Sequence, residues 1–342
     1  MEQEPRKVGI RPLALTLGEP AGIGPDITLL AWLRRNELKV PPFYVLGDHD
    51  FLARRARMLG LEVSLAEIEP ADTEATFTDA LPVVPIAAAA TADAGRPDAS
   101  SAPAALASIR RAVADVQAGH AGAVVTNPVA KGVLYRAGFR HPGHTEYLAE
   151  LAASNGKTPQ PVMMLWSPLL AVVPVTIHLS LREAIAQLTT DLIVSTARIV
   201  ADGLKVGFGI SRPRLALSGL NPHAGEDGSL GTEDNAIVAP AVEILRARGI
   251  DARGPLPADT MFHEAARKSY DCAICMYHDQ ALIPIKTLAF DDGVNVTLGL
   301  PFSRTSPDHG TDFDIAGTGR ANPASLIAAL RLAGRMAAAR SA

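Results

Sequence analysis

The sequence predicts an α/β protein with a parallel sheet, divided into two lobes. Short apolar segments alternate with amphipathic ones along most of the chain, which is typical of strands joined by helices. The 342 residues exceed the size that one core usually organises, and 48% of them are apolar. Several apolar segments also end in polar residues, and open α/β sheets bind ligands at the carboxyl ends of their strands. The densest such end, 276–286, contains a histidine, a carboxylate, an amide and a lysine.

The composition argues against some classes of partner. The formal net charge is -4 and the sequence pI is about 6.1, without a long basic run, so we expect no nucleic acid partner. The charged start, 1–7, lacks the apolar core of a signal sequence, and no apolar stretch of 18 residues occurs. We therefore expect no membrane span and a cytoplasmic protein.

The only cysteines, Cys272 and Cys275, have the C-x-x-C spacing of some redox and zinc sites. Both lie inside the apolar segment 272–276, where the alternation of a strand would direct them to different faces. No helix begins between them, as it would in a thiol redox motif. We therefore predict two structural thiols.

The first β–α unit is a strand over 12–17, a glycine loop over 18–27 and a helix that continues to Arg35. The loop contains Gly22 and Gly24 but lacks the third glycine of the dinucleotide fingerprint. The proline after Gly24 is expected at the first helical position. These glycines alone do not establish a nucleotide-binding fold.

The alternation continues through the rest of the chain. Further strands are expected at 42–46, 121–126, 214–220 and 272–276. Further helices are expected at 50–59, 104–118, 191–205 and 323–337. The Ala-, Asp- and Pro-rich segment 86–103 is read as a connecting loop, and 161–177, interrupted at Ser167-Pro168, as two paired strands.

Three histidines, His178, His223 and His278, each follow an apolar strand-like segment. The intervals of 45 and 55 residues are too long for one helix face or one hairpin, so only tertiary structure could gather them. A buried imidazole needs a partner, and three such residues at strand ends fit a three-histidine metal site. Neutral histidine ligands suit zinc, cobalt or nickel better than magnesium.

A set of donors fits an anionic ligand. Lys286, Asn295 and Arg304 occur late in the chain, the last two in or near what is read as a glycine-rich polar loop over 293–301. His144 and Thr145 stand at an expected helix start, where free N–H groups favour anions.

Seven motifs in order carry a resemblance to a known family: G-E-P-A-G-I-G-P-D (18–26), P-G-H-T-E (142–146), I-H-L (177–179), N-P-H-A-G-E (221–226), P-L-P-A-D-T (255–260), Y-H-D-Q-A-L-I-P-I-K (277–286) and N-V-T-L-G-L-P-F-S-R-T-S-P-D-H-G-T (295–311). On these motifs the sequence resembles the 4-hydroxythreonine-4-phosphate dehydrogenases of pyridoxal phosphate biosynthesis over nearly the whole chain. The resemblance implies an isocitrate-dehydrogenase-like α/β/α fold of two lobes with the active site in the cleft between them. It also implies a homodimer with shared active sites.

The resemblance further implies the reaction. NAD, or NADP, would oxidise 4-hydroxythreonine 4-phosphate at its 3-hydroxyl, and the 3-keto acid would decarboxylate to 3-amino-2-oxopropyl phosphate. One divalent metal per site, zinc, cobalt or magnesium with a zinc-like ion favoured, would be held by His178, His223 and His278. The expected domains are a cofactor-side domain, 1–135 with 305–342, and a domain for metal, substrate and dimerisation, 136–304.

The remaining site residues are carried over from matching motifs. The implied substrate residues are His144, Thr145, Asp259, Lys286, Asn295 and Arg304. Lys286 and Asp259 would also be catalytic. The implied cofactor residues are Gly22, Gly24, His309, Gly310 and Thr311, because they resemble the opening glycine loop and the adenosine-binding H-G-T of the wider decarboxylating dehydrogenases.

Three alternatives remain open. A related dehydrogenase of the same fold could act on threonate or erythronate 4-phosphate, or on an aromatic cis-dihydrodiol carboxylate. A metal- or ligand-binding protein without turnover, and an acyltransferase of the related phosphate acetyltransferase fold, are the rivals of other classes. A substrate-dependent rise in NADH absorbance would separate the dehydrogenases from both.

Overall fold

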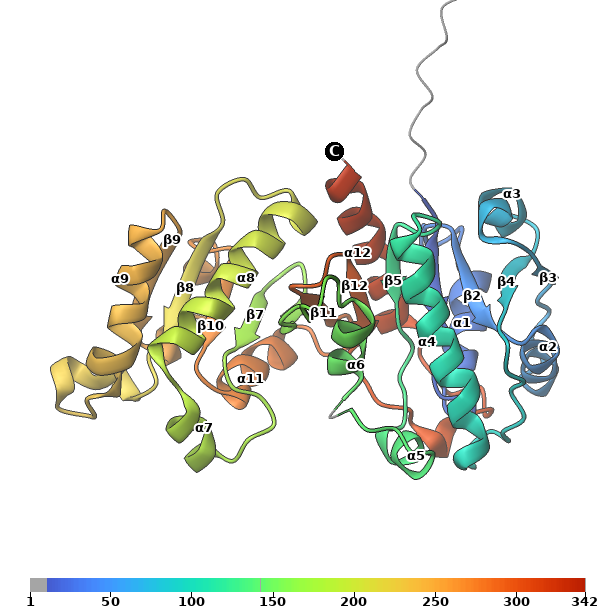
Figure 1. The fold of residues 1–342 in the computed structure, drawn as a ribbon, viewed down its shortest axis with the longest axis horizontal. Coiled ribbons are helices and arrows are strands. Elements are labelled where there is room, and N and C mark those ends of the chain that lie inside the picture. The colour runs from blue at the N-terminus through green and yellow to red at the C-terminus, as the bar shows by residue number, and fades with distance from the viewer. Residues whose placement is uncertain (1–10, 142, 342) are drawn as a thin grey trace, which may run out of the picture. The chain divides into compact units, whose positions relative to one another are not determined.

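The computed structural model describes residues 11–141 and 143–341, so the charged start 1–7 and the proline of the P-G-H-T-E motif lie outside the described residues. Contacts divide the chain into two compact units, Met1–Leu151 with Phe302–Ala342 (unit 1) and Ala152–Pro301 (unit 2). Each unit contains paired strands with helices packed on them (Figure 1). The α/β fold class is thereby confirmed.

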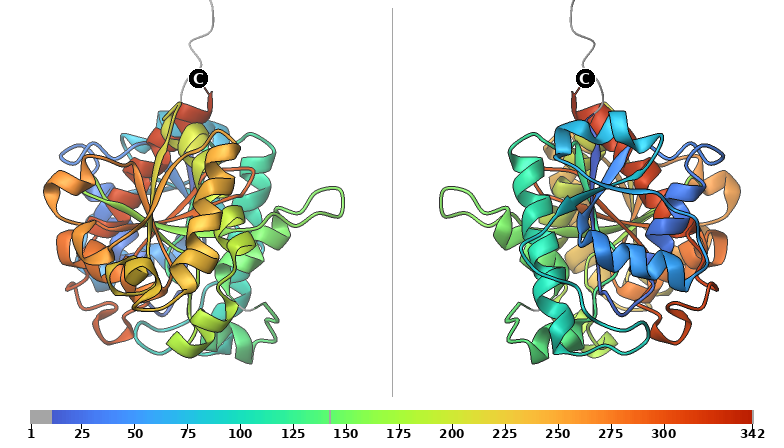
Figure 2. Two further views of the ribbon diagram at one scale, coloured as in Figure 1. Left: turned by 90° about the vertical axis from the view of Figure 1, so that its left-hand side faces the viewer. Right: turned by 90° about the vertical axis from the view of Figure 1, so that its right-hand side faces the viewer.

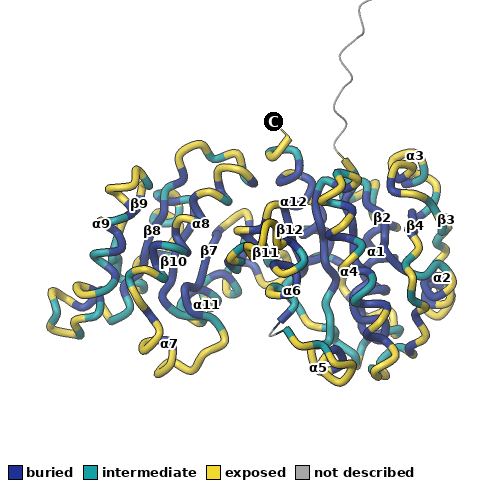
Figure 3. The backbone as a smooth tube through the Cα atoms, viewed as in Figure 1, coloured by how far each residue is buried: buried dark blue, intermediate teal, exposed yellow. Residues whose placement is uncertain are grey.

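Unit 1 contains a parallel sheet with the strand order β3-β4-β2-β1-β5-β12. The strands are β1 Leu13–Thr16, β2 Phe43–Gly47, β3 Leu65–Glu67, β4 Leu81–Pro85, β5 Ala123–Val125 and β12 Arg304–Pro307. In the centre, Leu13 pairs with Phe43 on one side and with Ala123 on the other. These central strands are fully buried (Figure 3), which explains why they read as continuous apolar runs.

Helices cover this sheet. They are α1 Gly24–Leu33, α2 His49–Met58, α3 Thr73–Phe77, α4 Ala102–Gln117, α5 Lys131–Arg136, α6 His144–Leu151 and α12 Ala324–Ser341. Helix α4 packs on β1, β2 and β5, and α12 packs on β12, β5 and β1. Pro25 is the second residue of α1, where the sequence predicted the first; either position lacks an intrahelical acceptor for its N–H, so both tolerate proline.

Unit 2 has the strand order β11-β6-β7-β10-β8-β9. The strands are β6 Val162–Trp166, β7 Ala171–Pro174, β8 Arg214–Ser218, β9 Asp251–Leu256, β10 Cys272–Cys275 and β11 Val294–Leu298. Strand β6 is antiparallel to both β7 and β11, whereas β7, β10, β8 and β9 run parallel. The two paired strands expected over 161–177 are confirmed.

The prediction of a polar loop over 293–301 was wrong. Residues 294–298 form β11, whose register pairs Asn295 with Leu165 and Thr297 with Met163. The segment alternates Val, Asn, Val, Thr and Leu, so a β-propensity signal was present beneath the glycines that flank it.

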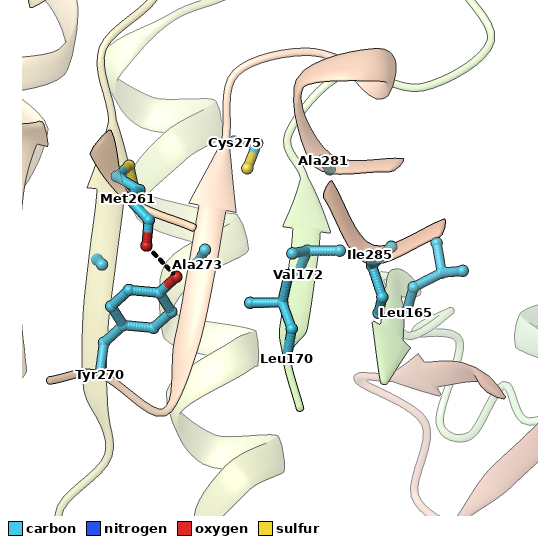
Figure 4. Close-up of a cluster of buried hydrophobic side chains, with 10 residues drawn as sticks. Leu165, Leu170, Val172, Met261, Tyr270, Ala273, Cys275, Ala281 and Ile285 are labelled. Atoms are coloured by element: carbon cyan, nitrogen blue, oxygen red, sulfur yellow. Dashed lines mark hydrogen bonds between the residues drawn. The ribbon is translucent and has the colours of Figure 1, made fainter. Parts of the chain in front are cut away.

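The helices of unit 2 are α7 Leu181–Gln187, α8 Thr190–Phe208, α9 Ala239–Ala247, α10 Glu264–Arg267 and α11 His278–Leu288. Helix α11 packs on β7 and β10, and its Ala281 and Ile285 join a buried cluster with Val172 and Leu165 (Figure 4). In the same cluster, Oη of Tyr270 donates a hydrogen bond to the Met261 carbonyl over 2.8 Å. This core fixes the start of α11, which carries His278.

Three further features complete the description of the fold. The loop between α6 and β6 projects from the fold (Figure 2), and residues 153–158 in it are exposed. Helix α6, expected in the second domain, belongs to unit 1, where it packs against α4. In the part of the chain that the structure describes, no single helix is long and apolar enough to cross a membrane; only α7 and α8 taken together, bent by 90°, reach that length and composition.

Candidate functional site

The three predicted histidines follow three neighbouring parallel strands of unit 2. His178 follows β7, His278 is the first residue of α11 directly after β10, and His223 lies in the turn Pro222–Gly228 after β8. The strands lie side by side in the order β7-β10-β8. Since parallel strands end at the same edge of a sheet, this edge gathers polar side chains from all three.

The structure brings two of the three histidine rings together. The ring centroids of His178 and His278 are 5.8 Å apart with an interplanar angle of 41°. A ring bound to zinc has its centroid about 3 Å from the ion, so two rings on one ion have centroids within about 6 Å of each other. Nδ1 of His278 also lies 2.7 Å from Oδ1 of Asp279, which directs Nε2 away from that carboxylate. The pair therefore fits a divalent metal in ligand type and spacing.

The third histidine is not brought into this group. Among the described residues, no three His, Cys, Asp or Glu side chains are arranged to hold a metal ion. His223 is exposed and begins a run of five left-handed residues, 223–227, which we call the His223 turn. The turn 258–260, which carries the exposed Asp259, packs against this region.

Gln280 ties the β10 end to the β8 end. Its Oε1 accepts hydrogen bonds from Oγ of Ser218 and from the Met276 N–H, both at 2.7 Å, and its Nε2 donates to the Gly219 carbonyl over 2.8 Å. One amide thus fixes the backbone before His278 relative to the strand that leads to His223. The Gln of the Y-H-D-Q motif is therefore a structural link between two histidine-bearing segments.

The structure agrees with the prediction that the two cysteines are structural thiols. Cys272 and Cys275 are fully buried in β10 and form no disulfide. Burial raises the pKa of the Cys275 thiol to about 12 and raises the pKa of Cys272 well above its ordinary value. Both are thiols at neutral pH, which argues against metal or redox chemistry there.

Unit 1 contains a buried cationic site where β12 begins beside the carboxyl end of β5. Arg304 is 4% exposed, and its Nη2 donates to Oγ1 of Thr126 over 2.6 Å. Burial lowers the pKa of Arg304 to about 10, so the guanidinium is still charged at neutral pH. A buried guanidinium of this kind fits an anionic ligand, because its planar fork forms charge-assisted hydrogen bonds to phosphate oxygens.

His144 stands beside this arginine. Burial, and after it the positive charges of Arg304 and Lys131, lower the pKa of His144 well below its ordinary value. Its Nε2 is buried and has no hydrogen-bond partner among the described residues. A neutral imidazole with an unsatisfied nitrogen next to a cation is suited to hydrogen-bond a phosphate oxygen.

The other predicted substrate residues are divided between the units. Thr145 is the second residue of α6 in unit 1, whereas Asp259, Lys286 and Asn295 lie in unit 2. Nζ of Lys286 lies 5.5 Å from the ring centroid of Phe290, and Asn295 is half-buried in β11. Within one unit, the structure thus groups His144, Thr145 and Arg304.

The predicted cofactor residues of unit 1 contact one another. The Ile23 N–H donates to the Thr311 carbonyl over 3.0 Å, and a Cβ added to Gly22 would lie 2.8 Å from that oxygen. Glycine is required at this position because the H-G-T segment approaches so closely. Nε2 of His309 is buried without a hydrogen-bond partner in the described chain, while its Nδ1 lies 3.0 Å from the Gly310 carbonyl. An unsatisfied nitrogen beside a glycine loop fits the polar edge of a nucleotide.

A buried ion pair shapes the glycine loop. Asp26 and Arg55 are both buried and paired, and Arg55 also donates to the carbonyls of Gly22 and Pro20. The second oxygen of Asp26 accepts from the Gly317 N–H over 2.7 Å. The pair therefore connects the glycine loop to the segment that follows H-G-T.

Sequence reasoning missed several polar residues that complete these sites. They are Thr126 and Lys131 beside Arg304 and His144, Arg55 behind the glycine loop, and Asp234 behind the His223 turn. Asp279 and Gln280 were singled out with the polar strand end 276–286, but the sequence assigned them no separate role. Thr126 is the last residue of the strand that the sequence predicts over 121–126, and Lys131 follows five residues later. Arg55 gave no local signal, because it lies in α2, 33 residues from Gly22 in the loop that it supports. Asp234 gave none because its backbone partners Leu220 and Asn221 lie 14 and 13 residues before it.

The fold and the placement of these residues are those of the open α/β class, in which ligands bind at the carboxyl ends of parallel strands. Residues 39–333 match the family model of the pyridoxal phosphate biosynthetic protein PdxA, and the chain belongs to this family.

The chain is 73% identical over 339 residues to a 4-hydroxythreonine-4-phosphate dehydrogenase of Bradyrhizobium diazoefficiens, covering 97% of this chain and 98% of that one. The crystal structure of a 4-hydroxythreonine-4-phosphate dehydrogenase from Klebsiella pneumoniae is 37% identical, with a TM-score of 0.84 over 96% of this chain and 99% of that chain. A terephthalate 1,2-cis-dihydrodiol dehydrogenase from Burkholderia xenovorans is 29% identical, with a TM-score of 0.64 over 95% of this chain and 98% of that chain. The resemblance inferred from the motifs is confirmed.

Proposed function

We propose that the chain is a metal-dependent dehydrogenase that oxidises 4-hydroxythreonine 4-phosphate at its 3-hydroxyl with NAD, and that the keto acid decarboxylates to 3-amino-2-oxopropyl phosphate. The high identity to dehydrogenases of that name supports the substrate. The observation that carries the proposal in the structure is the buried guanidinium of Arg304 with the half-buried His144 beside it, whose Nε2 is buried; this combination suits a phosphate.

Each proposed substrate residue has a task that follows from its chemistry. Arg304 holds the phosphate with a charged fork, and neutral His144 with Thr145 completes its hydrogen bonds. Lys286 and Asn295 bind the polar groups of the amino acid portion. Asp259 is proposed to accept the proton of the 3-hydroxyl, and Lys286 to donate a proton as the carboxylate leaves.

His178, His223 and His278 would hold one divalent metal, and Gly22, Gly24, His309, Gly310 and Thr311 would hold NAD. When bound, the metal would polarise the secondary alcohol as a Lewis acid, and NAD would accept the hydride. Imidazole ligands favour a zinc-like ion over magnesium, while cobalt also suits the set. Asp279 would keep the His278 ring oriented through Nδ1.

We further propose a homodimer in which the partner supplies one histidine to each metal site. The pairing of His178 with His278 in one chain supports His223 as the partner's contribution. Exposed apolar side chains lie next to the paired histidines: Leu181 and Ile185 on α7 are 62% and 47% exposed, Ile283 on α11 is 64% exposed, and Phe290, two residues after α11, is 73% exposed. Burial of such side chains against a second copy would stabilise a dimer. We expect the dimer to act in the cytoplasm.

One assay tests the activity. NADH absorbance at 340 nm would be followed with 4-hydroxythreonine 4-phosphate, threonate and erythronate 4-phosphates, an aromatic cis-dihydrodiol carboxylate and the unphosphorylated alcohols, each with zinc, cobalt or magnesium. We expect turnover only with a phosphorylated substrate. Turnover of a cis-dihydrodiol, as the name of the Burkholderia xenovorans neighbour suggests for that protein, would overturn the phosphate assignment.

A further inference from the structure

The His223 turn has a backbone that its side chains disfavour. The φ angles of His223, Ala224, Glu226 and Asp227 are 53, 54, 42 and 55°, and Gly225 between them has a φ of 81°. Residues with a Cβ avoid this region because Cβ approaches the following carbonyl oxygen. A run of four such residues must be imposed by the surrounding structure, and strain of this kind concentrates at functional sites.

One carboxylate makes the main contacts that fix the turn. Asp234 is fully buried. Its Oδ1 accepts from the Leu220 N–H over 2.6 Å, and its Oδ2 accepts from both the N–H and the Nδ2 of Asn221 over 3.0 Å. Only Pro222 separates these two residues from the turn, so Asp234 fixes the direction in which the chain enters it.

The carboxylate also fits closely between glycines. A Cβ added to Gly225 would lie 3.2 Å from Oδ2 of Asp234, and one added to Gly219 would lie 3.0 Å from Oδ1 and 2.7 Å from Cα of Ala224. Asp234 is also the first residue of a single π-helical turn, Asp234–Val238, a geometry that occurs frequently at functional sites. The turn, the two glycines and the carboxylate are thus packed as one unit.

We propose that Asp234 is a positioning residue for the metal site: its buried carboxylate holds the His223 turn in the left-handed conformation and so directs the imidazole of His223. This inference rests on the metal role proposed above for His223. Asp234 does not itself contact the metal, because it is buried behind the turn whose histidine is exposed.

Zinc affinity of the full-length protein, measured by isothermal titration, tests the inference. Asp234→Asn keeps the size of the side chain but replaces one acceptor oxygen with a donor that faces Asn221. We expect its zinc affinity to fall about ten- to a hundredfold, the usual effect of losing a residue that orients a ligand. Adding Ala224→Gly should restore part of this loss, because glycine adopts the left-handed region without steric cost.

Asp271→Asn is the matched control. Asp271 accepts hydrogen bonds from the N–H and the guanidinium of Arg214 at the other end of β8. A general loss of stability would affect both variants, whereas we expect zinc affinity to change only in Asp234→Asn. Should Asp234→Asn fail to fold, Asn221→Ala removes the Nδ2 donor and is expected to lower zinc affinity to a smaller extent.

The outcomes separate the two proposals. If His223→Ala loses zinc while Asp234→Asn, or Asn221→Ala in its place, binds zinc as the unaltered protein does, the positioning role is overturned and the metal site stands. If His223→Ala keeps stoichiometric zinc, the proposed metal role of His223 is wrong, and the positioning role falls with it.

Discussion

Nη2 of Arg304 donates a hydrogen bond to Oγ1 of Thr126 over 2.6 Å, where β12 lies beside β5. The contact fixes the guanidinium before any ligand arrives. Arg304→Ala should raise KM for the phosphorylated substrate by an amount that corresponds to about 2 to 5 kcal/mol. Arg304→Lys should recover part of this, since a point charge remains but the planar fork is lost. An unchanged KM in Arg304→Ala would remove Arg304 from the substrate site.

Mixed dimers test the origin of the metal ligands. If His178 and His278 come from one chain and His223 from its partner, His178→Ala mixed with His223→Ala places both lesions in one site and leaves the other intact. About half of the activity of a dimer should return. His178→Ala mixed with His278→Ala should recover nothing. Recovery in the second mixture, after verified subunit exchange, would show that the ring pair does not share a metal.

His144 should make stability depend on pH. Burial lowers its pKa in the folded protein well below the ordinary value of about 6.5. Between the two pKa values the unfolded chain binds one more proton, so stability is full above about pH 6.5 and falls as pH decreases below it. In urea unfolding between about pH 7.5 and pH 5.5, His144→Gln should lose less stability than the unaltered protein. His120→Gln, at an exposed histidine of the same unit, is the control; equal slopes for His144→Gln and the unaltered protein would contradict the prediction.

Gly22→Ala should weaken cofactor binding. The added Cβ would meet the Thr311 carbonyl at 2.8 Å and separate the two loops. We expect NAD affinity, measured by titration in the absence of substrate, to fall at least tenfold, which is about 1.4 kcal/mol. Gly132→Ala is the control, because the nearest atom that its Cβ would meet is a guanidinium nitrogen at 3.7 Å. Equal affinities in both variants would place the cofactor elsewhere.

Asp26→Asn should destabilise the protein strongly. It leaves the buried charge of Arg55 without its partner, a change that typically costs about 3 to 5 kcal/mol. The measurement is the urea midpoint, with Glu37→Gln as the control because Glu37 forms an exposed pair with Arg34. The control should leave the midpoint unchanged. A midpoint shift in Asp26→Asn no larger than in the control would mean that the buried pair contributes no net stability.

The regular elements could be predicted because their signals are local. The strand over 12–17 and the helix over 191–205 appear as β1 and α8, since apolar runs and helical spacing are properties of a short window. Strand β11 was missed because the glycines on either side of it predict a loop, although its residues alternate as in a strand. The boundary between the units could not be predicted for a similar reason. Helix α6 belongs to unit 1 because it packs on α4, and these two helices are remote in sequence.

The site was predictable as far as its motifs reached. Motifs identified Arg304 and His144, but the surroundings that lower the pKa of both, removal from water first and for His144 also the charges of Arg304 and Lys131, are a tertiary property. The 5.8 Å separation of the His178 and His278 rings depends on the strand order β7-β10-β8, which sequence spacing does not encode. Whether His223 comes from the same chain or from its partner depends on the interface of the proposed dimer, which one sequence does not describe.

The pairing of β5 with β12 has a consequence for synthesis on the ribosome. Unit 1 begins at the start of the chain, yet its sheet gains β12 and the covering helix α12 only from the last residues. Unit 2 is one continuous segment and has all its strands by then. The unit whose first strands are made first is therefore completed only after unit 2, and one edge of β5 stays unpaired, open to wrong association, until β12 has been synthesised.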